Sequence, residues 1–158
     1  MRIATAAAGL AFCLVPAALA AQGPVRVGAE LSFAENANAG LGARLDMPLV
    51  PFWTRDLRLD VSFDYFFPGS SLNYWELNGD LAWGLPLARS RIALVLGGGL
   101  NLAHSSDSGV PGSGVTDLGI NLLFGLRFPT GRRLTPYLEL RPELGGGERF
   151  VLTAGVLF

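Results

Sequence analysis

The chain has 158 residues, enough for one domain, and half of them are hydrophobic, with a mean hydropathy of +0.38. The formal net charge is −1, which gives no electrostatic reason to expect nucleic acid as a partner. No apolar run after residue 21 approaches the roughly 18 residues that a membrane helix needs, so the apolar residues are dispersed, as is typical of a membrane β-barrel.

The chain begins with a segment typical of a secretory signal peptide. Arg2 supplies a positive start, residues 3–19 are apolar and rich in alanine, and Ala18-Leu19-Ala20 is a small-x-small cleavage signal. We therefore predict a signal peptide over residues 1–20 and a barrel over residues 21–158. The single cysteine, Cys13, falls in the signal peptide, so the mature chain has no thiolate, and we expect no metal site and no cofactor.

The mature chain divides into eight alternating segments of about ten residues, separated by turn signals such as Pro68-Gly69-Ser70-Ser71. The predicted strands are residues 25–34, 40–47, 57–66, 72–83, 91–103, 115–128, 134–144 and 149–158. The last strand ends on the apolar-face aromatic residue Phe158, as expected if it pairs with the first strand and leaves no open edge. The prediction is an all-β protein, an eight-stranded antiparallel up-and-down transmembrane β-barrel.

Alternation alone does not tell which face meets the solvent. A lipocalin-like soluble barrel would put the apolar face inside, and a membrane barrel would put it outside. The interior of an eight-stranded barrel is only wide enough to be filled by side chains, and the apolar faces hold more large residues than such a lumen could contain. The opposite face is small or charged, which suits a narrow lumen and would be costly in lipid.

The charged face predicts a polar network inside the barrel. It holds nine acids and five arginines: Arg26, Glu30, Arg44, Asp46, Arg58, Asp60, Asp64, Glu76, Asp80, Asp117, Arg127, Glu139, Arg141 and Glu143. Such a set could form an ion or proton path, or a plug in which buried charges pair with one another. For a barrel this narrow we favour the plug, with a narrow ion-conducting pore as the alternative.

Aromatic residues favour two belts at the membrane interfaces. If the N-terminus starts on the periplasmic side, one belt holds Trp83, Phe128 and Phe158. The other belt holds Phe33, Tyr65, Trp75 and Phe150. Aromatic girdles at both interfaces are a feature of bilayer-spanning barrels.

With its signal peptide, eight strands and terminal Phe158, the chain resembles the small eight-stranded outer-membrane β-barrel proteins of Gram-negative bacteria, of the OmpA/OmpX type. The resemblance implies a location in the bacterial outer membrane, contact with outer-membrane lipid, and recognition of the last strand by the barrel-assembly machinery. It implies a non-catalytic role in envelope integrity or surface contacts. The predicted loop from His104 to Gly114 is a candidate site for a surface ligand.

A second resemblance suggests a lipid A-modifying hydrolase. Outer-membrane lipid A deacylases carry a His-x-Ser pair on a lipid-facing strand, and His104 and Ser106 match that pair. A serine nucleophile needs a nearby base, and the base needs an orienting carboxylate. Asp117 is the acidic candidate here, but it is Asp where the family has Glu, and it has inward parity. We keep this enzyme as an alternative and expect no catalysis.

Overall fold

The computed structural model describes residues 25–35, 37–49, 56–69, 71–107, 109–110, 112–131, 133–145 and 150–158. The predicted signal peptide, residues 1–20, lies outside the described residues, so its removal stays a prediction. In the described ranges no helix is long and apolar enough to cross a bilayer.

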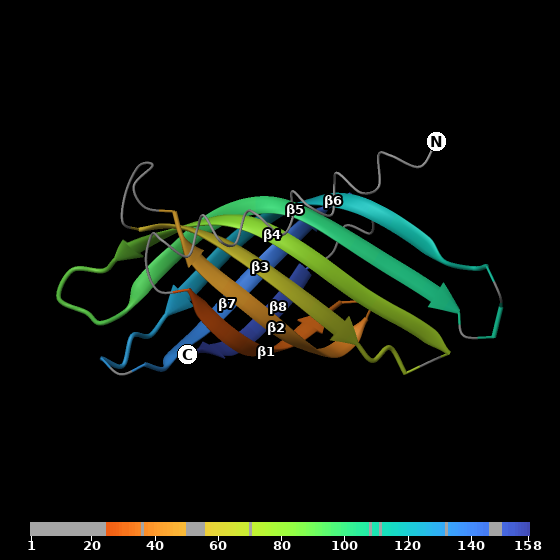
Figure 1. The fold of residues 1–158 in the computed structure, drawn as a ribbon, viewed down its shortest axis with the longest axis horizontal. Helices are drawn as coiled ribbons and strands as arrows, with labels where there is room; N and C mark the ends of the chain where they lie inside the picture. Colours follow the sequence, from red (N-terminus) through yellow and green to blue (C-terminus); the bar gives the residue numbers. More distant parts are fainter. Residues whose placement is uncertain are drawn as a thin grey trace.

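Eight antiparallel strands form one closed barrel (Figure 1). The strands are β1 (Arg26–Ala34), β2 (Asn38–Pro48), β3 (Leu57–Phe66), β4 (Leu72–Pro86), β5 (Ala93–Asp107), β6 (Val115–Arg127), β7 (Thr135–Leu144) and β8 (Phe150–Leu157). Each strand pairs with its neighbours in sequence, and β1 also pairs with β8, from Gly28 opposite Leu157 to Ala34 opposite Val151. The predicted fold class is confirmed.

The apolar face of every strand points outward. Leu31, Leu100 and Leu118 are 50%, 57% and 67% exposed, whereas the inward Ser32 and Arg44 are buried. Because side chains alternate strictly along a strand, this one observation orients the whole pattern. The soluble, lipocalin-like arrangement is therefore wrong for this chain.

The main correction to the predicted elements concerns the end of β5. The sequence suggested a loop from His104 to Gly114, but β5 continues to Asp107. The polar run at its end looks like a loop in sequence, yet each residue is paired with β4, up to Asp107 opposite Leu72. β4 likewise continues to Pro86, opposite Ala93, where a turn was predicted.

The wall of the barrel differs in height around its circumference. β4 and β5 have 15 residues each, whereas β1 has 9 and β8 has 8. We call the end that carries the connections 49–56, 87–92 and 128–134 and the C-terminal Phe158 the terminal end. The other end, with connections 35–37, 67–71, 108–114 and 145–149, is the distal end. In Figure 1 the C-terminus lies at the terminal end, and the β5–β6 connection reaches furthest at the distal end.

Candidate functional site

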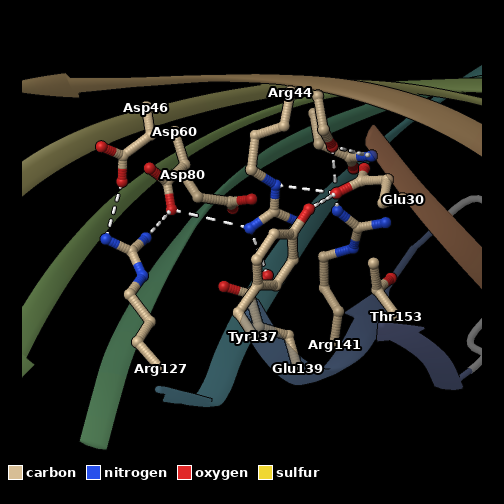
Figure 2. A network of polar contacts seen from close by, with 12 residues as sticks. Glu30, Arg44, Asp46, Asp60, Asp80, Arg127, Tyr137, Glu139, Arg141 and Thr153 are labelled. Atoms are coloured by element: carbon tan, nitrogen blue, oxygen red, sulfur yellow. Dashed lines mark hydrogen bonds and ion pairs between the residues drawn. The ribbon is translucent and has the colours of Figure 1, made fainter. Parts of the chain in front are cut away.

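The lumen of the barrel is filled by charged side chains. Eight acids and three arginines are buried there: Glu30, Asp46, Asp60, Asp64, Glu76, Asp80, Glu139, Glu143, Arg44, Arg127 and Arg141. They come from β1 to β4 and from β6 and β7, at the inward positions of each strand. Buried charge is costly unless it is paired. The three arginines lie at three successive levels along the barrel (Figure 2), within 4.0 Å of seven of the eight acids, and Asp80 accepts from Asn121 instead.

Arg127 forms the level nearest the terminal end. Its Nη1 lies 2.6 Å from Asp46 Oδ2 and its Nη2 lies 2.7 Å from Asp60 Oδ2. Arg58, at the terminal mouth, also pairs with Asp46. Arg127 is on β6 and Asp46 is on β2, four strands apart in a ring of eight, so this ion pair joins two facing walls of the lumen.

Arg44 forms the middle level. Its Nε lies 2.9 Å from Glu30 Oε2, and its Nη1 pairs with Glu139 on β7 and lies 3.7 Å from Asp60 Oδ2. The Tyr137 ring lies under the guanidinium, with its centroid 4.6 Å from Cζ, and the Tyr137 hydroxyl donates to Glu30. Arg44 is thus held by three carboxylates and one aromatic face, an arrangement that fits the planar fork of arginine.

Arg141 forms the level nearest the distal end. Its Nη2 lies 3.2 Å from Asp64 Oδ2 and 4.0 Å from Glu76 Oε2. Its Nη1 donates to Ser62 Oγ over 3.2 Å, and its Nε lies 3.8 Å from Glu143 Oε1. Arg141 is on β7 and Asp64 on the opposite strand β3, so this pair too joins two facing walls.

Neutral polar side chains complete the network between these levels. Asn121 donates from Nδ2 to Asn78 Oδ1 over 2.9 Å and to Asp80 Oδ1 over 3.3 Å. Asn101 donates to the same Asn78 oxygen over 3.2 Å. Ser32 donates to Asp64 over 2.7 Å. Asn78, Asn121 and Tyr137 also stand on the inward faces of their strands, but a network predicted from charge alone does not contain neutral amides and phenols.

An apolar cluster closes the lumen at the distal end. It consists of Ala34, Ala37, Phe66, Tyr74, Ala103 and Val151, and we call it the distal cap. The Phe66 and Tyr74 rings have centroids 5.4 Å apart, and the Tyr74 hydroxyl donates to Glu76. The cap therefore covers the distal side of the charged network with apolar side chains. Its one polar group, the Tyr74 hydroxyl, is hydrogen-bonded to Glu76.

Two members of the predicted charge set stand apart from the buried network. Arg26 lies at the terminal mouth and donates from Nη1 to Thr135 Oγ1 over 3.2 Å. Asp117 occupies an inward-facing position of β6, opposite Ala103, but its side chain is exposed at the distal rim. The described part of the chain contains no group of three or more His, Cys, Asp or Glu side chains arranged to hold a metal ion.

Two solved structures of outer-membrane proteins have the same architecture. The N-terminal β-barrel domain of Pseudomonas aeruginosa OprF superposes with a TM-score of 0.71 at 14% identity, over 87% of this chain and 97% of that one. Neisserial surface protein A gives a TM-score of 0.60 at 17% identity, over 84% and 94%. The chain has the fold of the small outer-membrane β-barrels.

Sequence comparison alone does not reach this relationship. No protein-family model matches the chain, and no curated protein sequence matches it. Ail, the attachment invasion locus protein of Yersinia pestis, covers 85% of the chain at 15% identity with a TM-score of 0.44. The fold, together with the outward apolar face described above, places the protein in the bacterial outer membrane.

The seven aromatic residues predicted for the two belts lie near the two rims of the barrel. Trp83, Phe128 and Phe158 are at the terminal end of their strands or just beyond it. Phe33, Tyr65, Trp75 and Phe150 are near the distal end. All seven have outward parity, and Phe33, Phe150 and Phe158 are each more than half exposed. The spacing suits two girdles at the two membrane interfaces.

The His104 and Ser106 pair lies on the outward face of β5, near the distal rim. His104 Nδ1 is 2.8 Å from Thr116 Oγ1, and the imidazole stacks on Trp75 with ring centroids 5.2 Å apart. Asp117 lies on the inward side of β6, so the wall of the barrel separates it from the imidazole. The structure brings together a histidine, a threonine hydroxyl and an indole here, and it does not bring the three residues of the proposed triad together.

Proposed function

We propose that the protein is a non-catalytic outer-membrane barrel that serves the envelope as a structural or surface-contact element, with its lumen plugged by the Arg/Asp/Glu network. The observation that carries the proposal is the set of three arginines that each bridge facing walls of the lumen. Arg127 joins β6 to β2 and β3, Arg44 joins β2 to β1 and β7, and Arg141 joins β7 to β3.

The energetics of these bridges support a plug. To pass, an ion must separate at least one buried pair at each level, and breaking a buried pair by removing a partner costs about 3–5 kcal/mol. The three levels lie in series, and above them the distal cap adds an apolar constriction. A steady current through this lumen therefore requires concerted rearrangement of most of its side chains.

Conductance of the purified barrel in planar bilayers tests the proposal. We expect no steady conductance from the wild-type protein, beside a general porin as the positive control. A Phe66→Ala, Arg141→Ser variant loses the distal cap and only the level nearest the distal end, so it should stay closed because the Arg44 and Arg127 levels remain in series. A steady open state of the wild-type barrel would support the narrow-pore alternative and end the plug proposal.

We propose no hydrolase activity at His104 and Ser106. The imidazole is engaged by the Thr116 hydroxyl, and its indole neighbour Trp75 gives it the surroundings of an interfacial aromatic girdle. We expect His104→Ala to leave the lipid A mass spectrum of expressing cells identical to that of wild type. A deacylated species that depends on His104 would overturn this assignment.

The partners that we propose follow from the surfaces of the barrel. Outer-membrane lipid covers the outward apolar face. The barrel-assembly machinery reads β8, whose outward positions hold Phe150 and Leu152 and lead to Phe158. The terminal end, where β1 begins and β8 ends, faces the periplasm. The β5–β6 connection at the distal end, residues 108–114, is the candidate contact for a surface ligand.

A further inference from the structure

Charged side chains outside the lumen are divided between the two ends of the barrel. At the terminal end, Arg89, Arg91 and Arg133 are exposed. At the distal end, the accessible charges of the described residues are acidic, from Glu35, Asp107 and Asp117, with His104 beside them. Asp56 is the one exposed acid described at the terminal end. The terminal end therefore carries a local excess of positive charge on a chain whose net charge is −1.

The β4–β5 turn holds its two arginines on a fixed backbone. Leu87 N donates to Ile92 O over 3.0 Å, and Ser90 N donates to Leu87 O over 3.1 Å. The Ser90 hydroxyl accepts from Ile92 N over 2.7 Å. Every one of these bonds lies within the turn, so the positions of Arg89 and Arg91 along the rim are set before any ligand arrives.

Arg89 occupies a backbone conformation that disfavours its own residue type. Its φ is 64°, in the left-handed region where glycine or asparagine carries little cost and other residues cost about 1 kcal/mol or more. In the part of the chain that the structure describes, no carboxylate forms an ion pair with Arg89, Arg91 or Arg133. A residue that is held in a strained backbone conformation and forms no ion pair within the protein is a candidate for binding a ligand.

The β6–β7 turn brings a third arginine to the same part of the rim. Phe128 N donates to Pro136 O over 2.9 Å, and the Thr130 hydroxyl donates to Leu134 O over 2.7 Å, which braces the turn that carries Arg133. β5 and β6 pair up to their terminal ends, so the β4–β5 and β6–β7 turns are adjacent on the rim. In Figure 1 they are the green and blue turns at the left.

Apolar side chains place these turns at the depth of lipid headgroups. Trp83, Leu85 and Leu87 point outward along the last part of β4 and into the turn, at 49%, 37% and 43% exposure, and Leu134 is 45% exposed beside Arg133. A tryptophan and leucines directly followed by cationic residues mark the boundary between the acyl chains and the polar headgroups.

We propose that the turns 87–92 and 128–134 form a binding site for anionic phospholipid in the leaflet around the terminal end, with Arg89, Arg91 and Arg133 contacting lipid phosphate. Guanidinium groups bind phosphate oxygens through paired hydrogen bonds. Each basic residue near an anionic surface favours binding by about five-fold. Three such residues acting independently would give about 100-fold. Because salt screens exposed charges, we expect a smaller preference for anionic over zwitterionic lipid, about ten-fold, at physiological ionic strength. The site does not depend on whether the lumen conducts.

Fluorescence quenching by brominated lipid tests the proposal, with Trp83 as the reporter. The full barrel is refolded into mixed vesicles in a Trp53→Phe, Trp75→Phe background, so that Trp83 is the only tryptophan. Brominated phosphatidylglycerol and brominated phosphatidylcholine are then compared at equal mole fraction. We expect stronger quenching by the anionic lipid, reduced to parity in R89Q/R91Q/R133Q and retained in the charge-conserving R89K/R91K/R133K.

Heat-modifiability on SDS gels verifies that each variant is folded. Equal quenching by both lipids in the parent protein would overturn the proposal, as would an anionic preference that survives in R89Q/R91Q/R133Q. Excess inorganic phosphate separates a lipid site from a site for free phosphate. If phosphate abolishes the preference at constant ionic strength, the lipid assignment is wrong. None of these outcomes bears on the conductance experiment, so the two proposals fail or stand independently.

Discussion

Replacing Arg44 with methionine removes the middle level of the lumen network while keeping most of the side-chain volume. The guanidinium pairs with Glu30 on β1 and Glu139 on β7 and covers the Tyr137 ring. Methionine leaves two buried carboxylates facing an apolar side chain. Breaking a buried ion pair by removing one partner costs about 3–5 kcal/mol, and the small difference in volume adds little to this. We therefore expect the free energy of unfolding to fall by about 3–5 kcal/mol.

The matched control removes the orphaned charges as well. In R44M/E30Q/E139Q the carboxylates become neutral amides of nearly the same shape, and replacing a whole buried network by neutral groups is often close to energetically neutral. We expect the triple variant to recover to within about 1–2 kcal/mol of wild type. It should then be clearly more stable than R44M, although it carries two more substitutions.

Reversible denaturant unfolding in lipid vesicles, followed by tryptophan fluorescence, measures both differences. Heat-modifiability reports independently whether each variant is folded before unfolding begins. If R44M unfolds within about 1 kcal/mol of wild type, the middle level is not the buried ion pair that the structure shows. If the triple variant is no more stable than R44M, the cost comes from packing rather than from unpaired charge, and the electrostatic reasoning is refuted.

Three further predictions concern the wall, the cap and the whole barrel. A Cβ at Gly155 would lie 2.4 Å from the Tyr137 phenol, whereas one at Gly79 would meet nothing within 4 Å. In the same unfolding assay Gly155→Ala should therefore cost about 1–3 kcal/mol and Gly79→Ala less than about 0.5. Phe66→Ala should destabilise the barrel by about 3–5 kcal/mol through lost packing with Tyr74. If this variant is as stable as wild type, the distal cap does not stabilise the barrel. Wild-type protein in the outer-membrane fraction should shift on SDS gels when boiled; recovery in the soluble periplasm without a shift would contradict the membrane assignment.

The strict alternation of apolar and polar residues explains why the strands and the outward face of this barrel could be predicted from the sequence. A period of two assigns each residue to one face, and the limited volume of an eight-stranded lumen decides which face is inside. Pairing across the lumen follows different rules. Arg44 and Glu139 are 95 positions apart in sequence, and they meet because of the stagger and tilt of the closed sheet, which alternation does not encode.

The end of β5 shows where local sequence signals fail. His104, Ser105, Ser106 and Asp107 have the composition of a loop, and the strand prediction stopped before them. Pairing with β4 overrides that composition, because residues 104–107 lie opposite residues 72–75. Asp117 illustrates a related limit. Alternation predicts that its side chain faces the lumen, but β6 is paired with β7 only from Ile120 onward, so Asp117 lies beyond the closed wall and is exposed to solvent.

The uneven height of the wall has a consequence for the bilayer itself. At about 3.4 Å per residue and a tilt of about 40°, β8 with its 8 residues spans about 20 Å along the membrane normal, and β5 with its 15 residues spans about 40 Å. The apolar band of an outer-membrane barrel is about 25 Å tall. Lipids beside the seam of β1 and β8 must therefore shorten or tilt to avoid hydrophobic mismatch, whereas those beside β4 and β5 need not. We therefore expect the bilayer to be thinner beside β1 and β8 than beside β4 and β5, even where its lipids are uniform.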